Sequence, residues 1–118
     1  MNISYQGIGE WCATFLCDDL TEGEVVTVTD DGEVDECTAG DIFCGIVKSV
    51  AHDGSACSVQ LGGLAEVGYS GDDVPELGYN ELVADGTGGI KVAGEDDVGM
   101  NYLVISVDTT AKTAVIKL

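Results

Sequence analysis

The chain has 118 residues, the length of one ordinary domain, and 45% of them are hydrophobic, so a core can form without disulfides or metals. Its 22 acidic residues face four lysines and no arginine, which gives a formal net charge of −18. Because basic side chains supply most of the affinity for nucleic acids and anionic membranes, the charge argues against both partners. We interpret the acidity chiefly as an aid to solubility; a basic partner is the alternative.

The first ten residues form a glycine-hinged segment with little charge and with Ile3, Tyr5 and Ile8 as its larger apolar side chains. They lack the basic and apolar regions of a signal peptide, and no stretch of the chain approaches the roughly 18 apolar residues that a membrane helix needs. We therefore expect synthesis in the cytosol. We predict an extended N-terminal arm over residues 1–10 and one compact domain over residues 11–118.

Alternation of apolar and polar residues, punctuated by glycine, runs through the rest of the chain. In the segment 57–67, Cys57, Val59 and Leu61 share one side, and Gly62-Gly63 predicts a bulge or bend. No window carries a helical stripe. The pattern predicts an all-β fold, a single-domain barrel or sandwich of about seven to eight short strands. We place them near residues 11–17, 24–29, 42–50, 57–67, 81–84, 89–92, 102–107 and 113–118.

Turn signals separate these strands. The pairs Asp31-Gly32, Asp53-Gly54 and Asp85-Gly86 predict tight hairpin turns, because glycine has no Cβ and aspartate tolerates positive φ. Residues 68–78 are polar, contain Tyr69 and Pro75, and predict a loop long enough to have a function of its own.

The residues of catalysis are scarce. The single histidine, His52, lies in a predicted turn, and nothing in the spacing pairs it with a cysteine. The five cysteines are odd in number and include no Cys-x-x-Cys pair, so we expect buried free thiols rather than disulfides or a zinc site. We predict no catalytic residues, no cofactor and no metal, and hence that the protein is not an enzyme.

Two acidic segments, 30–36 and 95–97, are rich in oxygen ligands but lack the spacing of an EF-hand loop. We interpret both as exposed turns, and the glycine-rich segments 7–9 and 86–89 as turns rather than phosphate loops. A small enzyme or metalloprotein that uses the acidic loops stays open as the least favoured reading.

Aromatic side chains are the remaining candidates for function. Tyr5, Trp11, Tyr69 and Tyr79 are of a kind enriched at protein interfaces. Among them we expect Trp11 to be the one most prone to core packing, because it opens the first strand.

Three segments together resemble small all-β decoration (cement) proteins of phage and prophage capsids. They are Gly23–Val28, the stretch Thr38–Val47 with its Ala-Gly-Asp turn and Gly-Ile-Val strand, and Cys57–Gly63 with its closing glycine pair. The resemblance covers about residues 20 to 93.

The resemblance implies a non-enzymatic virion protein, made in the host cytoplasm, that sits on the capsid exterior and stabilises it. The partner would be the major capsid protein, and the decoration protein would be a homo-oligomer, typically a trimer. The arm would add a strand to a sheet edge of the capsid, and three arms on one trimer would act together. The resemblance implies Ile3, Tyr5 and Ile8 as the anchors of the arm, and the aromatic residues Trp11 and Tyr69 complete our set of predicted contact residues.

A second reading belongs to another class. The chain would be a β-barrel module that binds a small ligand or glycan through the loop at 68–78, or a tail or baseplate component of a phage. A glycan array, with Tyr69→Ala as the variant, separates this reading from the first.

Overall fold

The computed structural model describes residues 10–118 and contains ten strands and no helix in that range. The all-β prediction is confirmed, whereas the predicted number of strands was too low. The predicted arm lies outside the described residues except for Glu10. No helix in the described part is long and apolar enough to cross a membrane.

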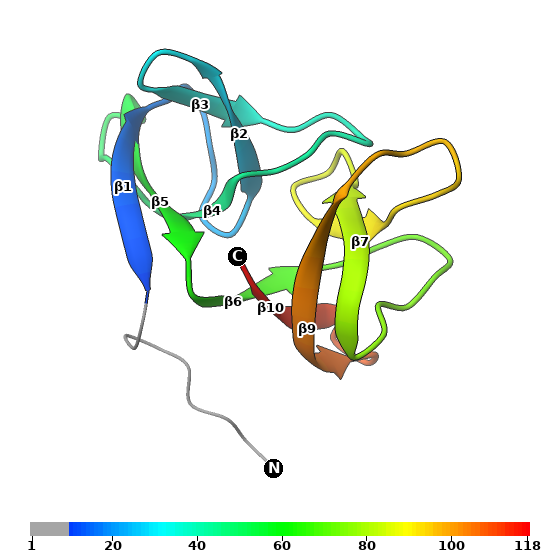
Figure 1. Cartoon of the computed structure of the whole chain (residues 1–118). Coiled ribbons are helices and arrows are strands. Elements are labelled where there is room, and N and C mark those ends of the chain that lie inside the picture. Colours follow the sequence, from blue (N-terminus) through cyan, green and yellow to red (C-terminus); the bar gives the residue numbers. More distant parts are fainter. Residues whose placement is uncertain (1–9) are drawn as a thin grey trace.

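The first half of the chain closes into a small barrel in the order β1-β3-β2-β4-β5 (Figure 1). All neighbours are antiparallel except β1 and β3, which pair in parallel only where Leu16 meets Glu33. The strands are β1 (Trp11–Leu16), β2 (Val25–Asp30), β3 (Glu33–Glu36), β4 (Gly45–Val50) and β5 (Ala56–Gly62).

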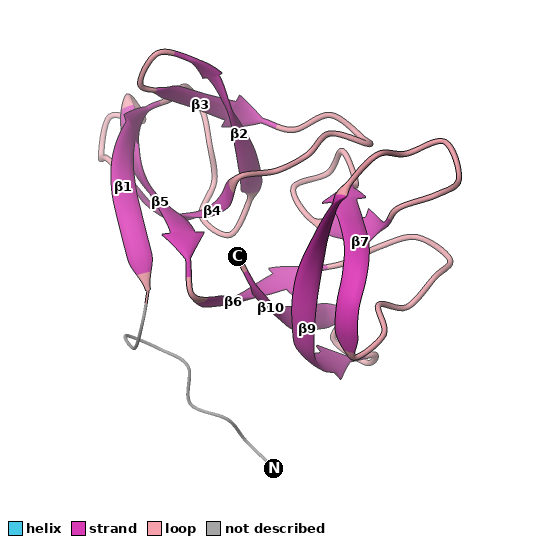
Figure 2. Cartoon of the chain, in the orientation of Figure 1, coloured by secondary structure: helices cyan, strands magenta, loops and turns pink. Residues whose placement is uncertain are grey.

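The second half forms a five-stranded antiparallel sheet in the order β6-β10-β9-β7-β8 (Figures 1 and 2). Just beyond β6, Tyr69 makes a parallel bridge with Ile90 of β8, so the two edges of the sheet meet at one point. The strands are β6 (Leu64–Gly68), β7 (Gly78–Ala84), β8 (Ile90–Val92), β9 (Met100–Asp108) and β10 (Thr113–Lys117).

Because side chains alternate along each strand, the barrel strands contribute side chains to two separate cores. One set of side chains fills the barrel interior: Leu20, Val26, Val34, Val47, Cys57 and Val59. Their strand neighbours Val25 and Ile46 point out of the barrel and pack against the second sheet, together with Cys37 and Phe43. The inner face of that sheet supplies the other side of this larger core: Ala65, Val67, Tyr69, Leu82, Ala84, Ile90, Tyr102, Val104, Ala114 and Ile116.

An aromatic pair lies in the core between the barrel and the second sheet. Phe43, in the connection before β4, stacks on Tyr102 of β9 with ring centroids 4.6 Å apart and planes 10° from parallel. The Tyr102 hydroxyl donates a hydrogen bond of 2.8 Å to the backbone carbonyl of Phe43. Burial raises the pKa of Tyr102 to about 12, so it stays a neutral donor at physiological pH.

Two strand assignments differ from the prediction. The segment 30–36 contains β3 rather than an exposed turn only, because Val34 is buried in the barrel and Gly32, at φ 72°, makes the tight turn out of β2. The predicted strand 57–67 is two strands, β5 and β6. Gly63 has φ 88° at the bend, and the chain passes there from the barrel to the second sheet.

The predicted turn at Asp85-Gly86 is confirmed, and its aspartate ties the turn to the segment that follows β6. Asp85 Oδ1 accepts hydrogen bonds from the backbone N–H of Thr87 (2.7 Å) and Gly89 (3.1 Å), while Oδ2 accepts one from Ser70 Oγ (2.7 Å). Burial alone would raise the pKa of Asp85, but these hydrogen bonds outweigh it and hold the pKa below its usual value.

All five cysteines are free thiols. Cys37 and Cys57 are buried, as predicted, and burial is the main cause that raises the pKa of each to about 12. The prediction of burial was wrong for Cys12, which is exposed, and too strong for Cys17 and Cys44, which are half-buried. Cys17 follows the end of β1 and Cys44 precedes β4, whereas Cys12 is in the exposed first half of β1.

Phe43→Ala should lower the free energy of unfolding by about 3–5 kcal/mol, because it removes a fully buried ring from the core between the sheets. The matched control is Ile42→Ala at the exposed neighbouring position, which should cost less than about 1 kcal/mol. Urea unfolding followed by circular dichroism measures both. Equal losses in the two variants would contradict the role of Phe43.

Asp85→Asn should lower the free energy of unfolding by about 1–2 kcal/mol at pH 7, because charge-assisted hydrogen bonds are lost. Because the pKa of Asp85 is lower in the folded chain than in the unfolded chain, its ionised carboxylate stabilises the fold at pH values above the unfolded-state pKa. This stabilisation is lost as the pH falls through the folded-state pKa. The difference in the free energy of unfolding between Asp85→Asn and the wild type should therefore disappear below about pH 4. Asp72→Asn, in an exposed loop, is the control. A difference in the free energy of unfolding that stays constant down to about pH 2.5, roughly one unit below an ordinary Asp pKa, would refute this account.

Candidate binding surface

Trp11 lies on the surface at the start of β1, with 66% of its area exposed. The expectation that it packs in the core was wrong. It pairs with Gly62 at the end of the barrel, where the register between β1 and β5 shifts, and a Cβ added to Gly62 would lie 3.5 Å from the Trp11 ring. The indole therefore covers a glycine on the outside of the barrel.

Tyr69 has the opposite environment. Only 7% of it is exposed, and it belongs to the core between barrel and sheet. The bridge to Ile90 draws the residue after β6 inward, although it begins the polar loop. Its side chain thus offers little surface to a partner. The other three predicted contact residues, Ile3, Tyr5 and Ile8, lie outside the described residues.

The outer face of the second sheet carries a row of four side chains, of which only Tyr79 was a candidate from the sequence. Tyr79 of β7 is opposite Leu103 of β9, Leu103 is opposite Lys117 of β10, and Lys117 is opposite Leu64 of β6. The strand neighbours of Leu103, Lys117 and Leu64 point into the core. Tyr79 is opposite Leu103 and three residues before the core residue Leu82 on the same strand, so these four point away from the core. Tyr79 is 73% exposed, and Leu64 and Leu103 are half-buried. We call these four residues the outer row.

The outer row and Trp11 lie near one another. Leu64, at one end of the row, follows directly after the Gly62-Gly63 bend against which Trp11 packs. Figure 1 shows the start of β1 beside this corner between β5 and β6. Trp11 thus lies close to the Leu64 end of the outer row.

Charge surrounds this surface. Glu66 and Glu81 are exposed on the same face, next to Leu64 and Tyr79 along their strands. Lys48 lies 3.5 Å from Glu10 and Lys91 lies 3.9 Å from Asp97, so two of the chain's four cations already face carboxylates. An apolar row with one lysine in an acidic setting is suited to a partner that offers apolar pockets and basic groups.

The polar groups that could support chemistry are dispersed. His52 is exposed in the turn between β4 and β5, and the neighbouring Asp53 accepts hydrogen bonds from Ser55 Oγ (2.7 Å) and Ser55 N–H (3.0 Å). Within residues 10–118, no three His, Cys, Asp or Glu side chains are grouped so that they could hold a metal ion.

In comparisons with known proteins, no family model matches this chain, and no match was found among curated proteins.

The exposure of Trp11, the only tryptophan, is directly measurable. Its fluorescence in the native protein should resemble that of a solvated indole, with ready quenching by the neutral quencher acrylamide, because two-thirds of the side chain is exposed. Unfolding in urea should change the emission maximum little. A blue-shifted native emission that acrylamide does not quench would show that Trp11 is covered in solution.

Proposed function

We propose that this protein is a non-enzymatic phage virion component that binds the outer surface of a capsid and stabilises it. The observation that carries the proposal is the outer row itself: four side chains that point away from the core, with Tyr79 and Lys117 exposed, in a chain whose net charge is −18. Apolar anchors within a polar rim are typical of protein-binding surfaces. The resemblance of three sequence segments to capsid decoration proteins specifies the kind of partner.

In this proposal the predicted arm and the outer row make different contacts with the capsid. The arm joins the barrel at Trp11, beside the Leu64 end of the outer row. The arm would pair with a sheet edge of the major capsid protein through Ile3, Tyr5 and Ile8, while Trp11 and the outer row would rest on the capsid surface. Assembly as a trimer would join three such contacts and increase their combined affinity.

A second function is favoured by one local feature. The loop at 69–77 borders a pocket of about 230 Å³ whose lining includes Ser70, Asp72, Asp73, Lys91 and Asp97. Hydroxyl, carboxylate and ammonium groups together suit a sugar, as in a glycan-binding module or a tail or baseplate component of a phage. Because Tyr69 is buried, such binding would depend on Asp72 and Asp73 instead, and Asp72→Ala would abolish it on a glycan array.

Capsid binding can be tested by co-sedimentation with empty shells of the major capsid protein from the phage or prophage that carries this gene. The full chain should pellet with the shells, and Trp11→Ala and Tyr79→Ala should each weaken binding by at least about tenfold, because truncated aromatic anchors commonly cost that much. Each variant should melt within a few degrees of the wild type, since both side chains are exposed.

Val28→Ala is the matched control, an exposed apolar residue on β2 of the barrel, away from the outer row. It should leave binding unchanged. A chain that stays in the supernatant at high micromolar concentration would refute the proposal, and equal weakening by all three variants would refute the assigned surface.

A further inference from the structure

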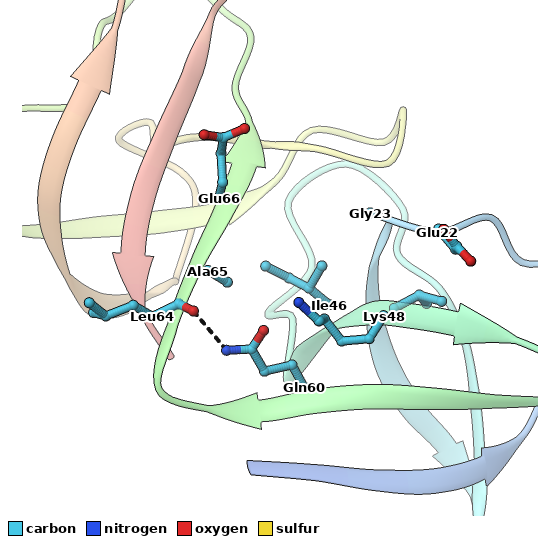
Figure 3. Close-up of a pocket in the computed structure, with 9 residues that line it drawn as sticks. Glu22, Gly23, Ile46, Lys48, Gln60, Leu64, Ala65 and Glu66 are labelled. Carbon is cyan, nitrogen blue, oxygen red and sulfur yellow. Dashed lines mark hydrogen bonds between the residues drawn. The ribbon is translucent and has the colours of Figure 1, made fainter. Parts of the chain in front are cut away.

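A pocket of about 390 Å³ lies where the barrel meets the second sheet (Figure 3). Its volume is within the range of small-molecule sites. Strands β4 and β5 and the turn before β2 form one side, and the start of β6 forms the other. The residues that matter for its chemistry are Glu22, Ile46, Lys48, Gln60, Ala65 and Glu66.

Gln60 is a fully buried polar residue, with 0% of its area exposed. Its amide nitrogen donates hydrogen bonds to the backbone carbonyls of Gly62 (3.0 Å) and Leu64 (2.9 Å), at the bend between barrel and sheet. Both amide hydrogens are thereby used, which fixes the orientation of the amide: the reverse orientation would place its oxygen against two carbonyl oxygens.

The Gln60 amide oxygen, in contrast, is buried without a hydrogen-bond partner among residues 10–118. Figure 3 shows it pointing away from Leu64 and into the pocket, toward the side chains of Ile46 and Lys48. The Lys48 ammonium does not bond to it and lies 3.5 Å from Glu10 instead. A buried acceptor that points into a pocket calls for a donor from outside the described chain.

The lining specifies the kind of donor. The pocket lining also includes Glu22, whose carboxylate attracts positive charge, and the aliphatic side chains of Ile46 and Ala65. An ammonium group has three hydrogens to donate and no acceptor, so it can donate to the amide oxygen, and the Glu22 carboxylate across the pocket (Figure 3) attracts its charge. An aliphatic stem can lie against the apolar lining.

We propose that this pocket binds a primary ammonium group on a short aliphatic stem, with the Gln60 oxygen as its buried acceptor. Two sources have this chemistry: a free alkylamine and a lysine side chain of a bound protein. The proposal stands independently of capsid binding, because it is tested on the isolated chain.

The test is a titration of the full chain with n-butylammonium, followed by ¹H–¹⁵N NMR of the Gln60 side-chain amide. The signals of Gln60 and the backbone amide of Ala65 should shift with saturation. The neutral n-butanol and the anion butyrate have matched stems and should bind at least about fivefold more weakly, because neither offers a charged donor. Butanol that binds as well as butylammonium, or no shift at Gln60, would overturn the proposal.

Charge variants distinguish binding in this pocket from non-specific electrostatic attraction to an acidic protein. Glu22→Gln should weaken butylammonium binding about three- to tenfold, and Lys48→Met should strengthen it by a similar factor, since a like charge leaves the lining. The control Glu95→Gln removes the same charge from an exposed loop residue outside the pocket and should change nothing. Equal weakening by Glu22→Gln and Glu95→Gln would overturn the site.

The two sources are distinguished with Nα-acetyl-lysine N-methylamide, which presents the same ammonium on a peptide-like backbone. Tighter binding than butylammonium assigns the pocket to a partner's lysine, and weaker binding assigns it to a free amine. Gln60→Met should abolish the binding of both, and its melting curve shows whether the variant is folded. A folded Gln60→Met protein that still binds either compound would overturn the role of the amide oxygen.

Discussion

The structure depends on the core that the barrel and the second sheet share, with the Phe43–Tyr102 pair at its centre. The interior of the barrel holds only six fully buried side chains, too few to stabilise a domain without help. The inner face of the second sheet, on its own, would expose leucine, isoleucine and valine side chains to water. Packing the outward residues of the barrel against that face solves both problems. The Tyr102 hydrogen bond to the Phe43 carbonyl then fixes one relative position of the two sheets.

Most of the strands and turns could be predicted from the sequence because their signals are local. Alternation identified β1, β2, β4 and β5 of the barrel and β7 to β10 of the second sheet, and Asp-Gly pairs identified three hairpin turns whose glycines have positive φ. β3 could not be predicted, because four residues with one apolar side chain carry almost no signal, and the barrel supplies the reason for Val34 to be buried. The bend at Gly62-Gly63 was predicted and is confirmed, but the change of sheet at this bend was not, since both halves of the segment 57–67 keep the same period.

The candidate surface was harder to predict than the fold. Alternation shows that a strand has two faces, but which face another layer covers is decided by residues far away in the sequence. Trp11 and Tyr69 show this: the first was expected inside and lies outside, and the second was proposed as a contact and is almost wholly buried. The outer row depends on the register of four strands, and the unpartnered Gln60 oxygen depends on the bend at Gly63.

Native-state hydrogen exchange tests the central claim most directly, because it reports the free energy of opening separately for each sheet. If the shared core joins the two sheets into one unit, buried amides of the barrel, such as those of Val26 and Val59, should exchange with the same free energy as those of Leu82 and Ile116 in the second sheet. That value should equal the global free energy of unfolding. Exchange of one set at a clearly lower free energy than the other would show that the sheets open independently and would contradict the account.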